Sequence, residues 1–226
     1  MTYRVENVGR SESGIAQPLA LIVLLSLTGM AVSPEPVTAQ AANAERLVEA
    51  ERLGWPVGEA EAPVTVVEFT DVSCPYCASF HAGTRAELAA EFVASGQVRW
   101  ITLTYVSGLY PNSEALSVAA ECAGREGLYE TFLHAAYEDR DAWVGGRRSA
   151  VASAIERLVE RTGLDPVTFA ACRRDPCARR RIERVGELAR EVGVRGTPTW
   201  FVDGFLVMGD LPLGYARRFI TTRLPG

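Results

Sequence analysis

The chain has 226 residues, 48% of them hydrophobic, so it can bury the core of one domain or of two small ones. This composition excludes a disordered protein, and the net charge of −5 argues against a broad nucleic-acid-binding surface, although all 23 basic residues are arginine. Five cysteines are an odd number, so in an oxidising compartment at least one thiol stays free or pairs outside this set.

The first forty residues are typical of an export signal. The apolar run LALIVLLSLTGMAV, residues 19–32, is shorter than the roughly 20 residues that span a membrane, and it suits the hydrophobic region of a signal peptide. Small residues at positions 37–41 offer cleavage sites. We predict a signal peptide over residues 1–41, with an uncleaved membrane anchor as the alternative, and a periplasmic or other extracytoplasmic location for the remainder.

Residues 42–58 are expected to form a short, weakly ordered lead-in. Helix-forming residues in its first part are followed by Gly54, Pro56 and Gly58, which interrupt regular structure. The next run, VTVVEF at 64–69, is dominated by β-branched and aromatic residues and predicts a buried strand.

A helix is predicted to begin at Pro75, because proline at the first helical position loses no needed hydrogen bond. We expect this helix to end near Gly96, before a second strand-like run, QVRWITLTYV, at 97–106.

The rest of the chain predicts a helical block followed by a hairpin. Between about 112 and 192, alanine, leucine and charged residues recur at helical spacing with glycine interruptions. The run TWFVDGFLVMG, 199–209, predicts two short strands joined at Asp203-Gly204, and 213–222 predicts a last amphipathic helix. This order predicts an α/β fold with an inserted helical block.

Two cysteines, Cys74 and Cys77, flank Pro75 and Tyr76 at the predicted strand-to-helix junction. A helix N-terminus stabilises a thiolate, which is the reactive form of cysteine, so Cys74 is the candidate nucleophile and Cys77 the more buried resolving thiol. A static disulfide and half of a zinc site are the alternatives. His81 completes a C-x-x-C-x-x-x-H pattern, but further ligands for a structural zinc site are not evident, so we predict no metal.

The run VTVVEFTDVSCPYC, followed much later by GVRGTPTWFVDG, resembles the DsbA-like branch of thioredoxin-fold thiol-disulfide oxidoreductases over roughly residues 55–223. The resemblance implies a thioredoxin-like domain formed by 59–110 and 193–226, with an all-helical insertion at 111–192. It also implies that the Thr197-Pro198 bond is cis and lies beside the cysteine pair. The substrate would then contact Pro75, Tyr76, Thr197 and Pro198.

Glu68 lies six residues before Cys74 within the predicted strand. Its carboxylate is either on the solvent face, or buried with its pKa raised. The buried acid of the resembled family falls at this offset, and in that role Glu68 would accept or relay the proton of Cys77. Asp71 matches a position that is commonly acidic in the family, and we expect it to be a turn or capping residue.

The same resemblance suggests a structural disulfide between Cys122 and Cys172, which would stabilise the fold by roughly 4 kcal/mol. Cys177 could compete for either partner or remain free, and three reduced buried cysteines are the alternative. The arginines between 173 and 184 are interpreted as a solvated helix face, because no interleaved aromatic residues offer stacking for a nucleic acid.

These features predict an exported thiol-disulfide oxidoreductase that forms disulfides in other exported proteins. Its partners would be unfolded or reduced exported proteins and, for an oxidase, a membrane partner linked to quinone. No metal, nucleotide, flavin or other cofactor is predicted. Because Tyr76 replaces the histidine of the best-known oxidising members, a reductase or isomerase remains an alternative, as does a non-catalytic binding module.

Overall fold

The computed structural model describes the backbone of residues 36–225 and the side chains from residue 43 onward. The predicted signal peptide lies almost entirely outside this range, and so does the apolar segment of the alternative anchor. Within residues 36–225, no helix combines the length and the apolar character that crossing a membrane requires.

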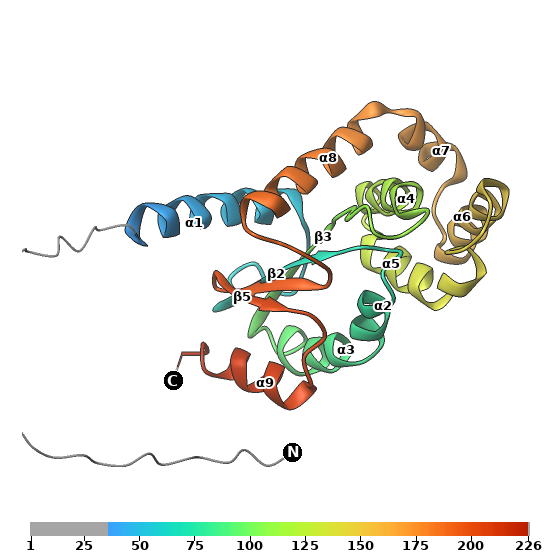
Figure 1. Ribbon diagram of the computed structural model, residues 1–226. Coiled ribbons are helices and arrows are strands. Elements are labelled where there is room, and N and C mark those ends of the chain that lie inside the picture. The colour runs from blue at the N-terminus through green and yellow to red at the C-terminus, as the bar shows by residue number, and fades with distance from the viewer. Residues whose placement is uncertain (1–35, 226) are drawn as a thin grey trace, which may run out of the picture. The chain divides into compact units, whose positions relative to one another are not determined.

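A five-stranded mixed sheet forms the centre of the fold (Figure 1), with strand order β1-β3-β2-β4-β5. The strands are β1 Trp55–Val57, β2 Val64–Thr70, β3 Val98–Thr104, β4 Thr199–Val202 and β5 Phe205–Met208. The central strands β2 and β3 are parallel, and each other neighbouring pair is antiparallel. The thioredoxin-like α/β fold predicted from the sequence is confirmed.

Helices cover both faces of this sheet. They are α1 Pro36–Leu53, α2 Pro75–Ala82, α3 Thr84–Leu88, α4 Ser113–Arg125, α5 Tyr129–Glu138, α6 Arg148–Thr162, α7 Pro166–Arg174, α8 Pro176–Glu191 and α9 Leu213–Thr221. Short turns of π-helix, Ala89–Val93, and of 3₁₀-helix, Arg140–Ala142, complete the set described. The predicted helix from Pro75 to Gly96 is therefore divided, because the backbone at Gly83 leaves the helical conformation.

The alternation of side chains along β2 separates two cores. Val64 and Val66 pack with residues of α2, α3 and α9, whereas Val67 and Phe69 pack with α1 and α8. Successive strand residues point to opposite faces, so the even-numbered Glu68 and Thr70 face the side that carries α2. The sheet thus directs these two polar side chains toward the cysteine-bearing helix.

The expectation of a weakly ordered lead-in over 42–58 is wrong. Leu47 and Ala50, one helical turn apart on α1, are buried against the sheet and α8. Gly54 ends the helix where a Cβ atom would come within 2.2 Å of Ile101 Cγ2, so the glycine permits close packing. The next residues form β1, which pairs with β3 at an edge of the sheet.

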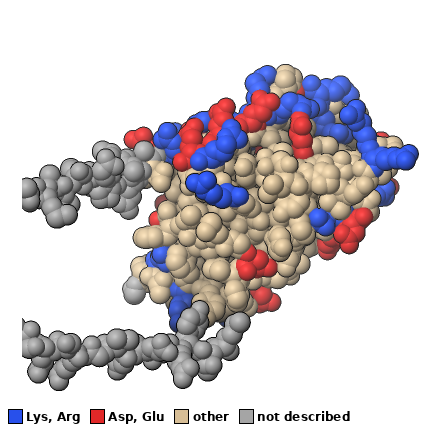
Figure 2. Space-filling model, in the orientation of Figure 1, with Lys and Arg blue, Asp and Glu red and all other residues tan. Residues whose placement is uncertain are grey.

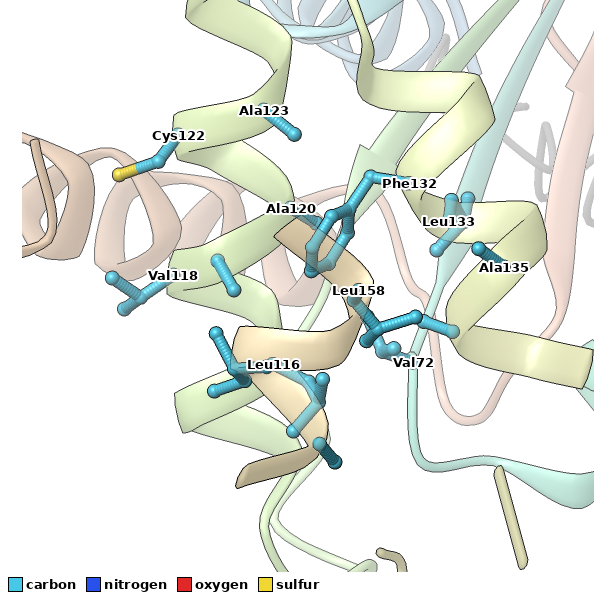
Figure 3. Packing of buried hydrophobic residues seen from close by; sticks show 14 of the residues in the cluster. Val72, Leu116, Val118, Ala120, Cys122, Ala123, Phe132, Leu133, Ala135 and Leu158 are labelled. Carbon is cyan, nitrogen blue, oxygen red and sulfur yellow. The ribbon is translucent and has the colours of Figure 1, made fainter. Parts of the chain in front are cut away.

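The helices α4 to α8 lie between β3 and β4 in the chain and form a lobe whose buried core extends to the cysteine-bearing segment. Figure 3 shows Leu116, Phe132 and Leu158 converging from α4, α5 and α6. The same cluster of buried residues includes Cys74 and Cys77. The helical lobe therefore provides part of the apolar surroundings of the cysteine pair.

Candidate active site

The cysteine pair lies at the junction that the sequence predicts. Cys74 is the N-cap residue of α2, Pro75 opens the helix, and Cys77 lies in its first turn. The backbone amide of Cys77 donates a hydrogen bond to Cys74 Sγ over 3.4 Å. Both cysteines are free thiols with an exposed fraction of 0%.

The two thiols have pKa values shifted in opposite directions. The pKa of Cys74 is lowered from 9.0 to about 5, and the largest cause is a hydrogen bond from the Cys77 thiol. Burial acts in the opposite direction. Hydrogen bonds from the Thr197 and Tyr110 side chains and from the Cys77 amide lower the pKa further. Burial, together with the neighbouring Cys74 thiolate, raises the pKa of Cys77 well above 9.0. At neutral pH Cys74 is therefore a thiolate and Cys77 a protonated thiol.

The Thr197-Pro198 peptide bond is cis, and the Thr197 carbonyl oxygen lies 3.3 Å from Cys74 Sγ. The fold thus brings together residues that are 123 positions apart. Pro75 and Tyr76 are exposed, and the Tyr76 side chain has an exposed fraction of 65%. Of the four residues predicted to contact substrate, Pro75 and Tyr76 lie between the cysteines in sequence, and Thr197 lies beside Cys74 in space, joined to Pro198 by the cis bond.

Glu68 is fully buried, and its carboxylate has three polar neighbours. It lies 2.9 Å from His81 Nε2, accepts a hydrogen bond from Trp100 Nε1 over 2.8 Å, and is 3.8 Å from Arg85 Nε. Burial alone would raise the pKa of Glu68, but the charges of His81 and Arg85 and the hydrogen bonds outweigh it and lower the pKa. The expected upward shift of this pKa is therefore wrong.

A buried polar network links Cys77 to the Glu68 region. The Thr70 hydroxyl hydrogen-bonds the Cys77 thiol and lies 2.7 Å from the Tyr137 hydroxyl. The Tyr137 ring in turn contacts the His81 ring, with centroids 4.8 Å apart. His81, considered in the sequence only as a metal ligand, is instead the hydrogen-bond partner of Glu68.

Asp71 is a buried turn residue that joins three segments. One carboxylate oxygen accepts hydrogen bonds from the Ser73 amide over 2.9 Å and the Ser113 hydroxyl over 2.6 Å. The other accepts from the Ser107 amide over 3.1 Å and the Ser107 hydroxyl over 2.8 Å. These contacts fix the turn before Cys74 against the segment that follows β3.

Tyr110 belongs to the site, although the sequence patterns do not single it out. Its hydroxyl lies 3.4 Å from Cys74 Sγ, and it comes from the loop between β3 and α4. A loop residue 36 positions from the cysteine has no periodicity or motif that would identify it before the fold is known.

The remaining cysteines are a disulfide-bonded pair and one free thiol. A disulfide with an S–S distance of 2.08 Å joins Cys122 on α4 to Cys172 on α7, the pairing that the family resemblance suggests. Cys177 is an exposed free thiol in the first turn of α8. Within the described part of the chain, no group of three or more His, Cys, Asp or Glu side chains is arranged to hold a metal ion.

The arginines of α8 are interleaved with acidic residues, as expected for a solvated helix face. Arg184 forms ion pairs with Glu49 and Glu187 over 2.7 and 2.9 Å, and Arg179 pairs with Glu114. Figure 2 shows blue and red atoms intermixed along the edge where Figure 1 places α1 and α8.

Comparison with known proteins identifies relatives over most of the chain. Disulfide bond formation protein D of Bacillus subtilis is 26% identical over 186 residues, covering 76% of this chain and 78% of that protein. The Na⁺/H⁺ antiporter NhaA 3 of Salinispora tropica is 32% identical over 148 residues. That match covers 65% of this chain but only 21% of the antiporter, so the chain spans about a fifth of that relative.

Solved structures share the fold. BdbD from Bacillus subtilis in its oxidised form has a TM-score of 0.69 and 21% identity, covering 77% of this chain and 95% of BdbD. Alpha-DsbA1 of Wolbachia pipientis has a TM-score of 0.66 and 18% identity, covering 75% of this chain and 89% of that one. Residues 53–221 match the family described as Thioredoxin. The chain belongs to the thioredoxin family, and it shares its fold with the DsbA and BdbD structures.

Proposed function

We propose that this chain is an exported thiol-disulfide oxidoreductase that forms disulfides in other exported proteins through Cys74 and Cys77. The observation that carries the proposal is the unequal state of the two sulfurs, with the pKa of Cys74 at about 5 and that of Cys77 raised. Stabilising the Cys74 thiolate stabilises the reduced enzyme, which makes its disulfide a stronger oxidant.

The reaction consists of two thiol-disulfide exchanges. A client thiolate attacks Cys74 Sγ of the enzyme disulfide, so that a client–Cys74 disulfide forms while the bond to Cys77 breaks and Cys77 takes up a proton. A second client thiolate then attacks the client sulfur of this mixed disulfide, forming the client disulfide and releasing the Cys74 thiolate. The client loses two electrons and the enzyme pair gains them.

The low pKa of Cys74 favours the second exchange, because a thiol of low pKa is the better leaving group. The raised pKa of Cys77 favours the first, because the departing sulfur takes a proton and remains neutral in its buried site. The Thr70 hydroxyl contacts Cys77 directly and hydrogen-bonds Tyr137, and the Tyr137 ring packs against His81, the hydrogen-bond partner of Glu68. We assign proton handling to Glu68 acting with His81.

The client is expected to bind across the surface formed by Pro75, Tyr76 and the cis Thr197-Pro198 bond, next to the sulfur of Cys74. The clients would be reduced or unfolded exported proteins. This chain would meet them after the signal at 1–41 directs it out of the cytoplasm. The name of the Bacillus subtilis relative, disulfide bond formation protein D, supports this direction of reaction. A membrane partner linked to quinone would restore the enzyme disulfide.

The test is the reduction potential of the Cys74–Cys77 pair in the full chain, measured by equilibration with glutathione buffers. A potential near about −120 mV supports an oxidase, whereas one near about −270 mV indicates a reductase. A pair that no glutathione ratio reduces indicates a static bridge and overturns the proposal. Oxidation of a reduced client, with Cys74→Ser as the inactive control, tests the direction of exchange independently.

A further inference from the structure

The redox site contains a hydroxyl group from outside the segment that carries the two cysteines. Tyr110 Oη lies 3.4 Å from Cys74 Sγ, at the end of the loop that follows β3. Tyr76, the tyrosine between the cysteines, has an exposed fraction of 65%. The hydroxyl that reaches the sulfur of Cys74 is thus supplied by a segment 36 residues away.

We propose that Tyr110 is a catalytic residue of this site, whose hydroxyl donates a hydrogen bond to the Cys74 thiolate and makes the pair more oxidising. This inference rests on the proposed function and adds a residue to its mechanism.

The groups around Cys74 Sγ differ in whether they can donate a hydrogen bond to its thiolate. The Thr197 carbonyl oxygen, 3.3 Å from the sulfur, can only accept a hydrogen bond, so it can pair with the Cys74 thiol but not with its thiolate. The hydrogen bond to Cys74 raises the pKa of Tyr110 above its usual range, so this hydroxyl keeps its proton beside the thiolate and remains a donor. The thiolate therefore receives hydrogen bonds from Tyr110 and from the Thr197 side chain, as well as from the thiol and amide of Cys77.

A hydrogen-bonded cluster of the buried Asp71, Ser73 and Ser113 and the half-buried Ser107 holds Tyr110 in this place. Ser107 and Ser113 flank the loop that carries Tyr110, and both donate hydrogen bonds to the Asp71 carboxylate. The same carboxylate binds the Ser73 amide, and the Asp71 carbonyl accepts from the Cys74 amide over 3.0 Å. One side chain with an exposed fraction of 0% thus sets both ends of the loop relative to the nucleophile, which makes Asp71 and Ser113 positioning residues.

The effect of Tyr110 on the reduction potential depends on whether its hydrogen bond forms in the reduced or in the oxidised enzyme. A donor that stabilises the thiolate favours the reduced enzyme, whereas the disulfide form has no thiolate to accept it. Removing the Tyr110 hydroxyl should therefore raise the pKa of Cys74 and make the disulfide harder to reduce. We expect a change of about tenfold in the equilibrium constant with glutathione, which is about 30 mV toward more negative potential.

The experiment compares Tyr110→Phe with Tyr215→Phe in the full chain. Tyr215 is a matched control because its side chain is 69% exposed on α9. The readouts are the Cys74 titration, followed by thiolate ultraviolet absorbance or by the pH dependence of alkylation, and the glutathione equilibrium. We expect Tyr110→Phe to raise the Cys74 pKa by about one unit and to lower the potential, and Tyr215→Phe to change neither. If Tyr110→Phe leaves both quantities at the wild-type value, the inference is overturned.

Ser113→Ala tests the positioning role through a double-mutant comparison. Alone, it should shift the Cys74 titration in the same direction as Tyr110→Phe, by less; in the Tyr110→Phe background it should produce no further shift, since it acts through that hydroxyl. Equal shifts in both backgrounds would refute the positioning role. Client oxidation is measured separately: a wild-type protein that does not oxidise clients overturns the proposed function, while the Cys74 titrations still decide the role of Tyr110.

Discussion

At the scale of single residues, the hydrogen bond between the sulfurs of Cys74 and Cys77 gives these two cysteines different acidities. The hydrogen bond between the sulfurs is the largest cause that lowers the pKa of Cys74, and it also raises the pKa of Cys77, whose largest cause is burial. The amide of Cys77 adds a second donor to the same sulfur. The spacing of the pair on the first turn of α2 therefore produces the difference in acidity on which the proposed exchange depends.

Cys77→Ala should raise the pKa of Cys74 well above about 5, because it removes the donor with the largest effect. Cys77→Ser should raise it less, since a hydroxyl at the same position can still donate. The measurement is the rate of Cys74 alkylation as a function of pH in each variant. An alanine variant that titrates at the wild-type value would show that this contact does not set the acidity of Cys74.

At the scale of elements, the helical lobe is joined by a covalent bond between two of its helices. The disulfide between Cys122 on α4 and Cys172 on α7 closes a loop with a sequence separation of 50, and Cys122 lies within the buried core of the lobe. Cross-links over loops of this length restrict the unfolded chain more than the folded one. Phe169 is the residue of α7 that is buried, so the helix has little other packing to hold it in place. Its stability should therefore depend on the disulfide.

Replacing Cys122 and Cys172 together by alanine should lower the free energy of unfolding by about 4 kcal/mol, which is the chain-entropy value for this loop. Urea denaturation of the oxidised proteins measures the difference. Cys177→Ala is the matched control, and as an exposed free thiol it should change stability by less than about 0.5 kcal/mol. A double variant as stable as the wild type would contradict a stabilising role for the disulfide.

The sequence predicts elements well where local signals and burial agree. The β-branched run at 64–69 and Pro75 correctly place β2 and the start of α2. The error over 42–58 has a physical cause, because Gly54 and Pro56 resemble breakers of regular structure. In the fold Gly54 allows close approach to Ile101, and Pro56 lies in an edge strand, where a missing N–H group is tolerated.

In the candidate site too, some residues can be predicted from local sequence and others only from the fold. The cysteine pair and the cis-proline segment follow from local motifs and family resemblance. Tyr110 is positioned by hydrogen bonds between distant segments, and the downward pKa shift of Glu68 depends on the positions of His81 and Arg85. Such tertiary contacts have no signature in a single sequence.

At the scale of the whole molecule, the redox state of the pair is coupled to folding. In the reduced protein the folded-state pKa of Cys74, about 5, lies below its unfolded value of 9.0. The contribution of this thiol to stability is therefore fully present above about pH 9 and is lost as the pH falls through about 5. Cys77, with its raised pKa, loses its contribution only as the pH rises above 9.0, and in the oxidised protein neither sulfur titrates.

The reduced protein should therefore gain stability relative to the oxidised protein as the pH rises from about 5 toward about 9. Parallel urea denaturation of the two forms across this range gives the difference directly. The double variant Cys74→Ser/Cys77→Ser keeps the Cys122–Cys172 disulfide and is the matched control: any effect of reductant on its stability should not vary with pH between about 5 and 9. A difference between the two forms that stays constant with pH would contradict the assigned thiolate at Cys74.

The buried cluster that the cysteine pair shares with α4, α5 and α6 also limits how this protein can change over evolutionary time. An insertion with an independent core could be lengthened, shortened or exchanged between relatives as a unit. Here the insertion supplies part of the wall behind the reactive sulfurs, so substitutions in residues such as Leu116 or Phe132 alter the packing around the redox centre as well. The lobe and the chemistry must therefore evolve together, since neither can be replaced without rebuilding the surface that they share.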